Sequence, residues 1–479
     1  MKDRGPFFAA CCFAATALCL TLTACDSSES RARQALADYQ AASAAGDLRA
    51  SRIALLQLVA AEDDKSSNWQ ELGKVQIQLG SYSDAYYAFT RAYELDKSNP
   101  QVLSSLTQLS LLSGNVDVAE DHAQKLELLA PAHPAVKLTY GYVALRRGDF
   151  DRADQQVDQL LAEFPREPSA NLLKARIFLG RGKNQEAIKL LETQTQGMPT
   201  DAGSWKALMS LHERYRNWPG VTLAATKLAS LNPKNTEVAF TAVDAAFRGN
   251  DIEAALRGSE PFLQPDSPPN HVESILTIWA ERWRTPQALQ RVRELTRAAS
   301  PQQALAYATY FNSAGQPDDA AALLGGGAPR LPVSQTNLSS NAVIAESLAL
   351  RGELSQAKTL FDQILAREPD HVYALRGRIK LEIRTSAARA AITDAQRLIS
   401  VAPRSARDRL LLARAYSAAG DQRQVERTLW DAFHEIPANL MLYEALREHV
   451  ERSRGPEAAA RVDAEFQQQQ DTDLSREFI

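Results

Sequence analysis

The chain has 479 residues, enough for about two to four domains, and 45% of them are hydrophobic, which excludes a disordered protein. Lysine and arginine (54) nearly balance aspartate and glutamate (58), so the net charge of -4 does not indicate binding to nucleic acid or to a membrane surface. All four cysteines lie in the first 25 residues, which excludes a disulfide, a zinc–thiolate site or a thiol nucleophile in the rest of the chain. Alanine, leucine, glutamine and arginine are plentiful, and this composition favours helices.

The chain begins with the features of an export signal. Lys2 and Arg4 precede an apolar run from Phe7 to Leu22. This run is shorter than the roughly 20 residues that a membrane-spanning helix needs, but it has the length of a signal-peptide core. The sequence therefore predicts a signal peptide over residues 1–24.

The end of this segment, Leu22-Thr23-Ala24-Cys25, resembles the lipobox of bacterial lipoproteins. The resemblance implies cleavage before Cys25, a diacylglyceryl group on its sulfur, and a flexible tether over residues 25–31. An ordinary signal peptide, or an uncleaved anchor that happens to contain a cysteine, is the alternative. Asp26 resembles the inner-membrane retention signal of enteric bacteria, but that rule differs between bacterial groups and leaves the choice of membrane open.

Three residue types then recur at a step of 34 residues, and they keep one phase along the chain. The prolines of this lattice are Pro131, Pro165, Pro199, Pro233, Pro301, Pro369, Pro403 and Pro437. The glycines are Gly46, Gly80, Gly114, Gly148, Gly182, Gly352 and Gly420. The alanines are Ala85, Ala119, Ala153, Ala187, Ala255, Ala357, Ala391 and Ala459.

This lattice predicts repeated helical hairpins. Glycine can end the first helix of each hairpin because it turns without a steric penalty from Cβ, and proline cannot continue the second helix. Alanine is small enough to let the two helices cross closely. Between these marks, apolar residues recur at helical spacing, as in Trp69–Val75 and Ala85–Ala92. Repeats are expected to start near residues 32, 66, 100, 134, 168, 202, 236, 270, 304, 338, 372, 406 and 440.

The pattern resembles the tetratricopeptide repeat, whose marker residues are matched by Trp69, Leu72, Gly73, Ala85, Phe89 and Ala92. The resemblance implies an all-α, right-handed superhelical solenoid of about thirteen helix–turn–helix repeats. We expect a regular array over residues 32–201, degenerate repeats over 202–337, a C-terminal array over 338–473 and a short tail over 474–479. In the degenerate stretch the turn glycine is replaced by Arg216, Asn250, Arg284 and Asp318, and Gly- and Pro-rich breaks occur at 264–269 and 325–332. These breaks indicate either hinges with irregular stacking or merely decayed repeats.

No catalytic motif is found. The seven histidines form no close ligand pair, and the sequence has no Gly-x-Ser-x-Gly elbow. Gly180–Asn184 has some likeness to a phosphate-binding loop, but it lacks the earlier glycine and the Ser or Thr, and it falls on the repeat-turn lattice. We therefore expect a protein without enzymatic activity, catalytic residues, a cofactor or a metal site. The six tryptophans, including the neighbours Trp279 and Trp283, are assigned to packing.

In tetratricopeptide proteins the first helix of each repeat lines a concave groove, especially at repeat positions 2, 5, 9, 12 and 13. The residues predicted to bind in that groove are Lys74, Tyr142, Arg146, Arg176, Lys206, Arg214, Arg248 and Arg282. Further basic residues at the same repeat positions are Arg376, Lys380, Arg384, Arg414 and Arg452. Such a ladder suits an acidic peptide or an anionic polymer, because guanidinium groups bind carboxylates as a fork. The alternative is a solvated helix face, in which Glu213 and Glu281 neutralise the adjacent arginines.

The sequence thus predicts a non-catalytic scaffold lipoprotein of the bacterial envelope, anchored to the membrane by its lipid and facing the periplasm. Its layout is similar to that of tetratricopeptide lipoproteins of exopolysaccharide, exosortase and pilus systems, which implies other envelope proteins or their peptide segments as partners, and no nucleic acid. The alternative is a periplasmic carrier whose groove binds an anionic polysaccharide or an unfolded polypeptide.

Overall fold

The computed structural model describes residues 28–326 and 329–477, and within them all regular structure is helical. The predicted signal peptide, the lipidation site Cys25 and Asp26 lie outside the described residues. In the described part of the chain, no helix is both long enough and apolar enough to cross a membrane.

Consecutive helices form hairpins, each with a first and a second helix. The first helices are α2 (Ser28–Ala44), α4 (Ser66–Gln78), α6 (Pro100–Leu112), α8 (Pro134–Arg146), α10 (Pro168–Gly180), α12 (Ala202–Arg214), α14 (Thr236–Arg248), α16 (Pro269–Arg282), α18 (Ala304–Ser313), α20 (Leu338–Arg351), α22 (Val372–Arg384), α24 (Ala406–Ala418) and α26 (Leu440–Arg454). The second helices are α3 (Leu48–Ala61), α5 (Tyr82–Leu95), α7 (Val116–Leu129), α9 (Phe150–Glu163), α11 (Asn184–Gly197), α13 (Trp218–Leu231), α15 (Ile252–Ser259), α17 (Pro286–Thr296), α19 (Pro317–Leu323), α21 (Leu354–Arg367), α23 (Ala388–Val401), α25 (Gln422–Glu435) and α27 (Pro456–Glu477). The predicted all-helical array of helix–turn–helix repeats is confirmed.

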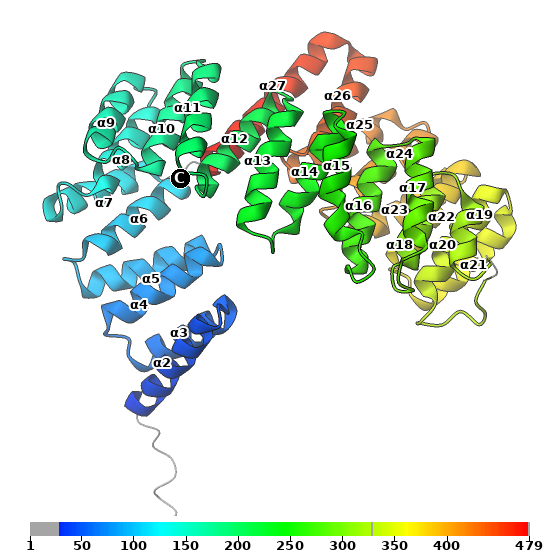
Figure 1. The fold of residues 1–479 in the computed structure, drawn as a ribbon, viewed down its shortest axis with the longest axis horizontal. Helices are drawn as coiled ribbons and strands as arrows, with labels where there is room; N and C mark the ends of the chain where they lie inside the picture. The colour runs from blue at the N-terminus through cyan, green and yellow to red at the C-terminus, as the bar shows by residue number, and fades with distance from the viewer. Residues whose placement is uncertain (1–27, 327–328, 478–479) are drawn as a thin grey trace, which may run out of the picture. The chain divides into compact units, whose positions relative to one another are not determined.

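The hairpins belong to two compact units, whose boundary lies between Ala187 and Ile188, inside α11. In unit 1, the helices from α2 to α10 each pack against the next one along the chain. In unit 2, the same consecutive packing runs from α12 to α15 and from α17 to α27, and α16 packs against α14 and α18. The last helix, α27, also packs against α12, as the red and green ribbons show in Figure 1. Unit 2 therefore brings its first and last described hairpins together.

The turn between the two helices of a hairpin uses the left-handed backbone region. The lattice glycines from Gly46 to Gly182 have φ between 69° and 78°. In the hairpins where glycine is missing, Arg216 and Asn250 keep this turn with φ of 53° and 59°. The turn therefore survives without glycine at these two positions, although a side chain there is strained. Near the predicted turn at Asp318 the chain instead turns at Gly315, with φ of 72°, because α18 ends early.

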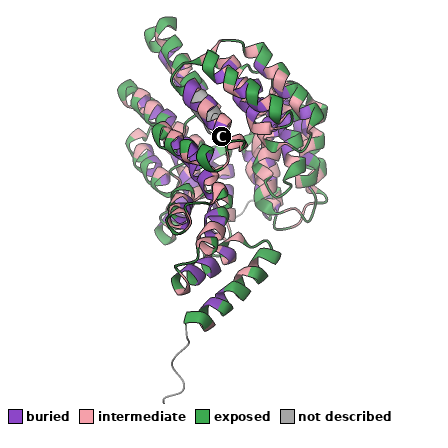
Figure 2. Ribbon diagram, turned by 90° about the vertical axis from the view of Figure 1, so that its left-hand side faces the viewer, coloured by how far each residue is buried: buried purple, intermediate pink, exposed green. Residues whose placement is uncertain are grey.

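The lattice alanines lie where helices meet. All eight of them have no exposed surface: Ala85, Ala119, Ala153, Ala187, Ala255, Ala357, Ala391 and Ala459. Buried residues follow the faces that the helices turn toward each other, and the outer faces are exposed (Figure 2). Close contacts such as these hold successive hairpins together.

The irregular stretch has short helices, and α18 and α19 contain only 10 and 7 residues. Side-chain hydrogen bonds hold both of its Gly- and Pro-rich breaks. The Gln303 amide donates hydrogen bonds to the carbonyl oxygens of Gln264 and Ser267, both at 2.8 Å, and Asn337 and Asn341 both donate to the carbonyl oxygen of Arg330. One hydrophobic cluster runs past both breaks, and it includes Trp279, which is 1% exposed as predicted. A hinge at either break remains a prediction.

Candidate functional site

A cavity of about 340 Å³ lies in unit 2 and is called the inner cavity here. Its lining comes from α16, α18, α20, α22, α24 and α26, the first helices of successive hairpins, and from Arg284 just after α16. Its basic lining residues are Arg284, Arg376, Lys380, Arg407 and Arg414. Its acidic lining residues are Glu273, Glu281, Glu346 and Asp408, and apolar contributions come from residues such as Leu410, Tyr310 and Met441. The inner cavity is therefore a mixed surface with a small excess of positive charge.

Some of these charges pair between neighbouring hairpins. Arg376 binds Asp408 through two hydrogen bonds of 2.8 Å, and the Asp408 side chain is only 2% exposed. Burial lowers the pKa of Arg376, but the hydrogen bonds and charge of Asp408 outweigh this and leave that pKa raised. Lys380 lies 2.6 Å from Glu346. These pairs stabilise the stacking of one hairpin on the next.

Other contacts join residues far apart in the chain. The Tyr373 hydroxyl donates a 2.7 Å hydrogen bond to Glu273, which is 100 positions away. Arg407 lies 2.9 Å from Glu281, and Arg248 lies 3.4 Å from Glu444, a separation of 196 positions. Burial and the charge of Glu273 both raise the pKa of Tyr373. In unit 2, α14 and α16 therefore face α22, α24 and α26 through side chains.

Four of the predicted groove residues, Lys206, Arg214, Arg248 and Arg282, lie in unit 2, and none of them lines the inner cavity. The Arg248 and Arg282 guanidinium groups both bind Asp244, at 2.7 and 2.6 Å. Arg248 also lies 5.1 Å from the centre of the Trp218 ring. Arg214 lies 5.9 Å from the centre of the Tyr215 ring, and Lys206 is exposed on α12. Arg248 and Arg282 are therefore engaged with a carboxylate of the chain itself.

The other four predicted residues lie in unit 1. Tyr142 is 2% exposed, and the Arg176 guanidinium lies 5.4 Å from the centre of its ring. Burial raises the pKa of Tyr142 to about 12, and burial lowers the pKa of Arg176. Lys74 pairs with Glu71 at 2.6 Å, and Arg146 is exposed. The structure brings Tyr142 and Arg176 together, and a ligand-binding role for all eight residues stays a prediction.

Arg376, Lys380 and Arg414 lie at predicted groove positions, whereas Arg407 and the acidic lining were not predicted. Arg407 occupies repeat position 2, so reading that position in every repeat would have found it. In the alternative of a solvated face, Glu281 would neutralise Arg282, but Glu281 pairs with Arg407 and Arg282 with Asp244.

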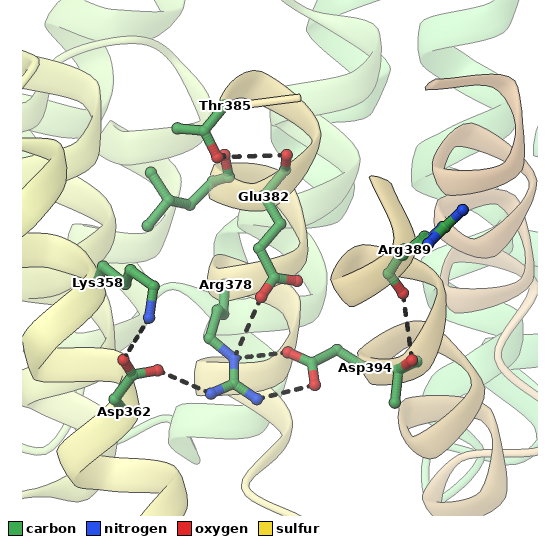
Figure 3. A network of polar contacts seen from close by, with 9 residues as sticks. Lys358, Asp362, Arg378, Glu382, Thr385, Arg389 and Asp394 are labelled. Carbon is green, nitrogen blue, oxygen red and sulfur yellow. Dashed lines mark hydrogen bonds and ion pairs between the residues drawn. The ribbon is translucent and has the colours of Figure 1, made fainter. Parts of the chain in front are cut away.

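A second polar cluster lies among α21, α22 and α23 (Figure 3). Arg378 binds both oxygens of Asp394, at 2.6 and 2.8 Å, and one oxygen of Asp362, at 2.9 Å. Glu382 lies 3.8 Å from Arg378, and its Oε2 atom is buried without a hydrogen-bond partner. Burial, together with the charge of Asp394, raises the pKa of Glu382 to about 7. The cluster borders a cavity of about 590 Å³, and nothing in the sequence pattern distinguishes this cluster from an ordinary charged helix face.

No group of metal-ligating side chains is assembled in the part of the chain that the structure describes.

Comparison with known proteins agrees with the repeat geometry. Residues 138–196, which run from α8 into α11, match the family model of the tetratricopeptide repeat. No curated protein matches the sequence.

Several solved structures are similar to part of this chain over most of their own length. A tetratricopeptide repeat protein from Parabacteroides merdae is 14% identical, with 60% of this chain and 99% of that chain covered and a TM-score of 0.32. The pilF protein of Pseudomonas aeruginosa is 15% identical, with 44% of this chain and 96% of that chain covered and a TM-score of 0.31. The MamA protein is 17% identical, with 35% of this chain and 91% of that chain covered and a TM-score of 0.30. The family match, together with helices that start at the same 34-residue step before and after it, shows that this chain carries tetratricopeptide repeats.

Proposed function

We propose that this chain is a non-catalytic scaffold that binds segments of other proteins in the inner cavity of unit 2. The supporting observation is that equivalent residues of successive repeats line one cavity. Tyr373, Arg407 and Met441 form one such row, and Glu346, Lys380 and Arg414 form another. Rows of equivalent side chains suit an extended chain, whose own groups also recur at a regular spacing.

The chemistry of the lining suits a peptide. Guanidinium and ammonium groups bind carboxylates, and Tyr and Thr hydroxyls hydrogen-bond to the peptide backbone. Leu410 and Met441 offer apolar contact, and the flexible thioether of methionine adapts to different side chains. In such a lining the charged groups would orient a bound peptide, and the apolar groups would adapt to its side chains.

We place this scaffold in the bacterial envelope, where it would serve in assembly, secretion or polysaccharide export. Support comes from the lipobox-like Leu22-Thr23-Ala24-Cys25, with its apolar run and basic start. A lipid on Cys25 would tether the repeats to a membrane and leave them in the periplasm.

The second candidate is a carrier for an anionic polymer or an unfolded polypeptide. It is favoured by the five basic residues of the lining, which outnumber its four acidic ones. A carrier would bind many chains of one chemical type, whereas a scaffold binds a defined set of proteins.

Affinity purification from envelope membranes separates the two. The full chain would be compared with Arg414→Ala/Met441→Glu, which alters the inner cavity, and with Arg427→Ala on the exposed face of α25. A scaffold predicts a discrete protein complex with the native chain and the Arg427 variant, and its loss with the cavity variant. A co-purifying glycan or mixed peptides would favour the carrier, and an identical protein set with all three chains would contradict a site in the inner cavity.

A further inference from the structure

The inner cavity of unit 2 is spanned by contacts between its two walls. The first wall consists of α16, with α14 packed beside it outside the lining, and the second wall consists of α20, α22, α24 and α26. Near the start of α16, Glu273 accepts the hydrogen bond of Tyr373 on α22, and near its end Glu281 binds Arg407 on α24. Beyond the cavity lining, Arg248 of α14 binds Glu444 of α26. The contacts between the two sides therefore involve α22, α24 and α26 one after another.

Similar contacts continue beyond α14, between α12 and the last two helices. After α12, the Arg216 guanidinium lies 6.0 Å from the centre of the Tyr443 ring of α26, and α27 packs against α12. Figure 1 shows α27 beside α12. The contacts that cross the cavity itself are polar or charged, whereas hairpins of one stack share an apolar core.

The choice of partners across the cavity is specific. Glu281 adjoins Arg282 in the sequence, yet Arg282 binds Asp244 and Glu281 binds Arg407 of the opposite wall. Within the second wall, Lys380 forms an ion pair with Glu346, and Arg376 forms one with Asp408. Arg407 is thus an inner-cavity cation whose carboxylate partner comes from the facing wall.

We propose that these glutamates occupy the places of a ligand's carboxylates, and that the partner of the inner cavity is an acidic peptide segment that displaces them and opens the walls. The inference rests on the proposed function and names its ligand class. Arg284 and Arg414 support it, because both cations line the same cavity and form no ion pair within the described residues. The carboxylates of a ligand would therefore meet two unpaired cations and gain a third, Arg407, when Glu281 leaves it.

The exposure of these contacts makes displacement easy. In the ion pair that crosses the cavity, the Arg407 and Glu281 side chains are 48% and 28% exposed. Ion pairs this exposed contribute little to stability and are screened by salt. A segment that carries several carboxylates can displace the glutamates of the chain, because each new ion pair is similar to the ion pair that is lost.

Zero-length cross-linking tests the closed state directly. Arg407→Lys in the full chain places an amine beside Glu281, and a carbodiimide then joins the two side chains only when they are in contact. The native Lys380–Glu346 pair, at 2.6 Å, is an internal control within one wall. We expect a 281–407 cross-link in tryptic peptides. Its absence, with the 346–380 product present, would overturn the proposal whatever the fate of the proposed function.

The ligand class is tested with hexaglutamate on the same Arg407→Lys chain, and hexaglutamine is the neutral control. Hexaglutamate should bind, suppress the 281–407 product and form an adduct with the amine introduced at position 407, and hexaglutamine should do none of these. A 281–407 product that persists while hexaglutamate is bound would overturn displacement. If hexaglutamate does not bind at low salt, the ligand class is wrong, although a discrete complex in the membrane purification would still support a scaffold.

Removal of one internal carboxylate should strengthen ligand binding. Glu281→Gln frees Arg407 and should tighten hexaglutamate binding by about two- to fivefold, the worth of one exposed ion pair. Glu448→Gln on α26 makes the same change in net charge, but Glu448 pairs with Arg452 of its own helix and does not line the cavity. Equal tightening in both variants, or none in Glu281→Gln, would overturn the proposal.

Discussion

Glu281 adjoins Arg282 in the sequence but lies 2.9 Å from Arg407, on a helix four hairpins further along the chain. The contact arises because successive hairpins of unit 2 stack with a small rotation, and these rotations add up until α16 faces α24. The same curvature sets Glu273 against Tyr373 and Arg248 against Glu444. The chemistry of the inner cavity therefore depends on the whole stack of unit 2.

Enlargement of a lattice alanine should destabilise unit 1. Ala153 has no exposed surface, so Ala153→Leu forces extra methyl groups into a filled contact. We expect a loss of about 1–3 kcal/mol in the free energy of unfolding, measured by urea denaturation followed by circular dichroism. Ala37→Leu, on the exposed face of α2, is the matched control and should change stability by less than about 0.5 kcal/mol. Equal effects at both sites would show that the alanine lattice does not mark helix crossings.

The buried pair of the second wall should be important for stability. Asp408→Asn removes the charge that binds Arg376, and the Asp408 side chain is 2% exposed. Arg376 keeps some contact with water, so we expect a loss of about 1–3 kcal/mol rather than the larger cost of a fully buried pair. Asp431→Asn, which breaks the exposed pair with Arg427, should cost less than about 0.5 kcal/mol. Thermal or urea unfolding of both variants measures the difference, and a cost for Asp408→Asn no larger than that of the control would be inconsistent with this assignment.

Unit 2 should lose stability as the pH rises toward neutrality because of Glu382. The folded state raises the pKa of this carboxyl from 4.5 to about 7, so the folded chain holds a proton that the unfolded chain has released. This contribution is fully present below about pH 4.5 and is lost as the pH rises through 7. Glu382→Gln, which cannot ionise, should therefore stabilise the protein at pH 8 by roughly 1–3 kcal/mol and have little effect at pH 4.5. Urea midpoints of both chains across this pH range give the test, and parallel curves for both would mean that Glu382 ionises normally.

A glycine in place of Ser386, in the turn between α22 and α23, should stabilise the protein. Ser386 has φ of 60°, a conformation in which a Cβ atom is strained. Ser386→Gly should stabilise the protein by up to about 1 kcal/mol, and the same change at the exposed helical residue Ala390 should destabilise it by about 1 kcal/mol. If both changes destabilise equally in urea unfolding, the turn at Ser386 is not under strain.

The proposed anchor predicts a simple cellular result. Cys25→Ser should abolish metabolic labelling of the chain with an alkyne-modified fatty acid and prevent its lipid-dependent retention in membranes. The native chain should label and sediment with membranes. Labelling that persists in the variant would contradict lipidation at Cys25.

Much of the fold could be predicted because the hairpin depends on local requirements. Ala153 and Ala357 mark crossings where only a small side chain fits, and Pro131 and Pro165 lie just after α7 and α9. The sequence could not show that Arg216 would keep the glycine turn, because arginine disfavours the left-handed region, whereas asparagine, as at Asn250, adopts it more readily.

The candidate site was less predictable. Repeat positions identified Arg376, Lys380 and Arg414 as inward-facing, since those positions depend only on the helix register. The partners of Arg407 and Arg248 depend on the accumulated curvature of many hairpins, which no single repeat encodes. Asp244, which binds both Arg248 and Arg282, was overlooked because only basic residues were read along the ladder.

The central claim is that other proteins bind in the inner cavity of unit 2. Photo-cross-linking in cells tests it most directly, with p-benzoylphenylalanine at Leu410, which lines the cavity, and at Arg427 on the exposed side of α25. We expect a discrete cross-linked partner at position 410 and none at 427. No product at 410, or the same product at both positions, would contradict it.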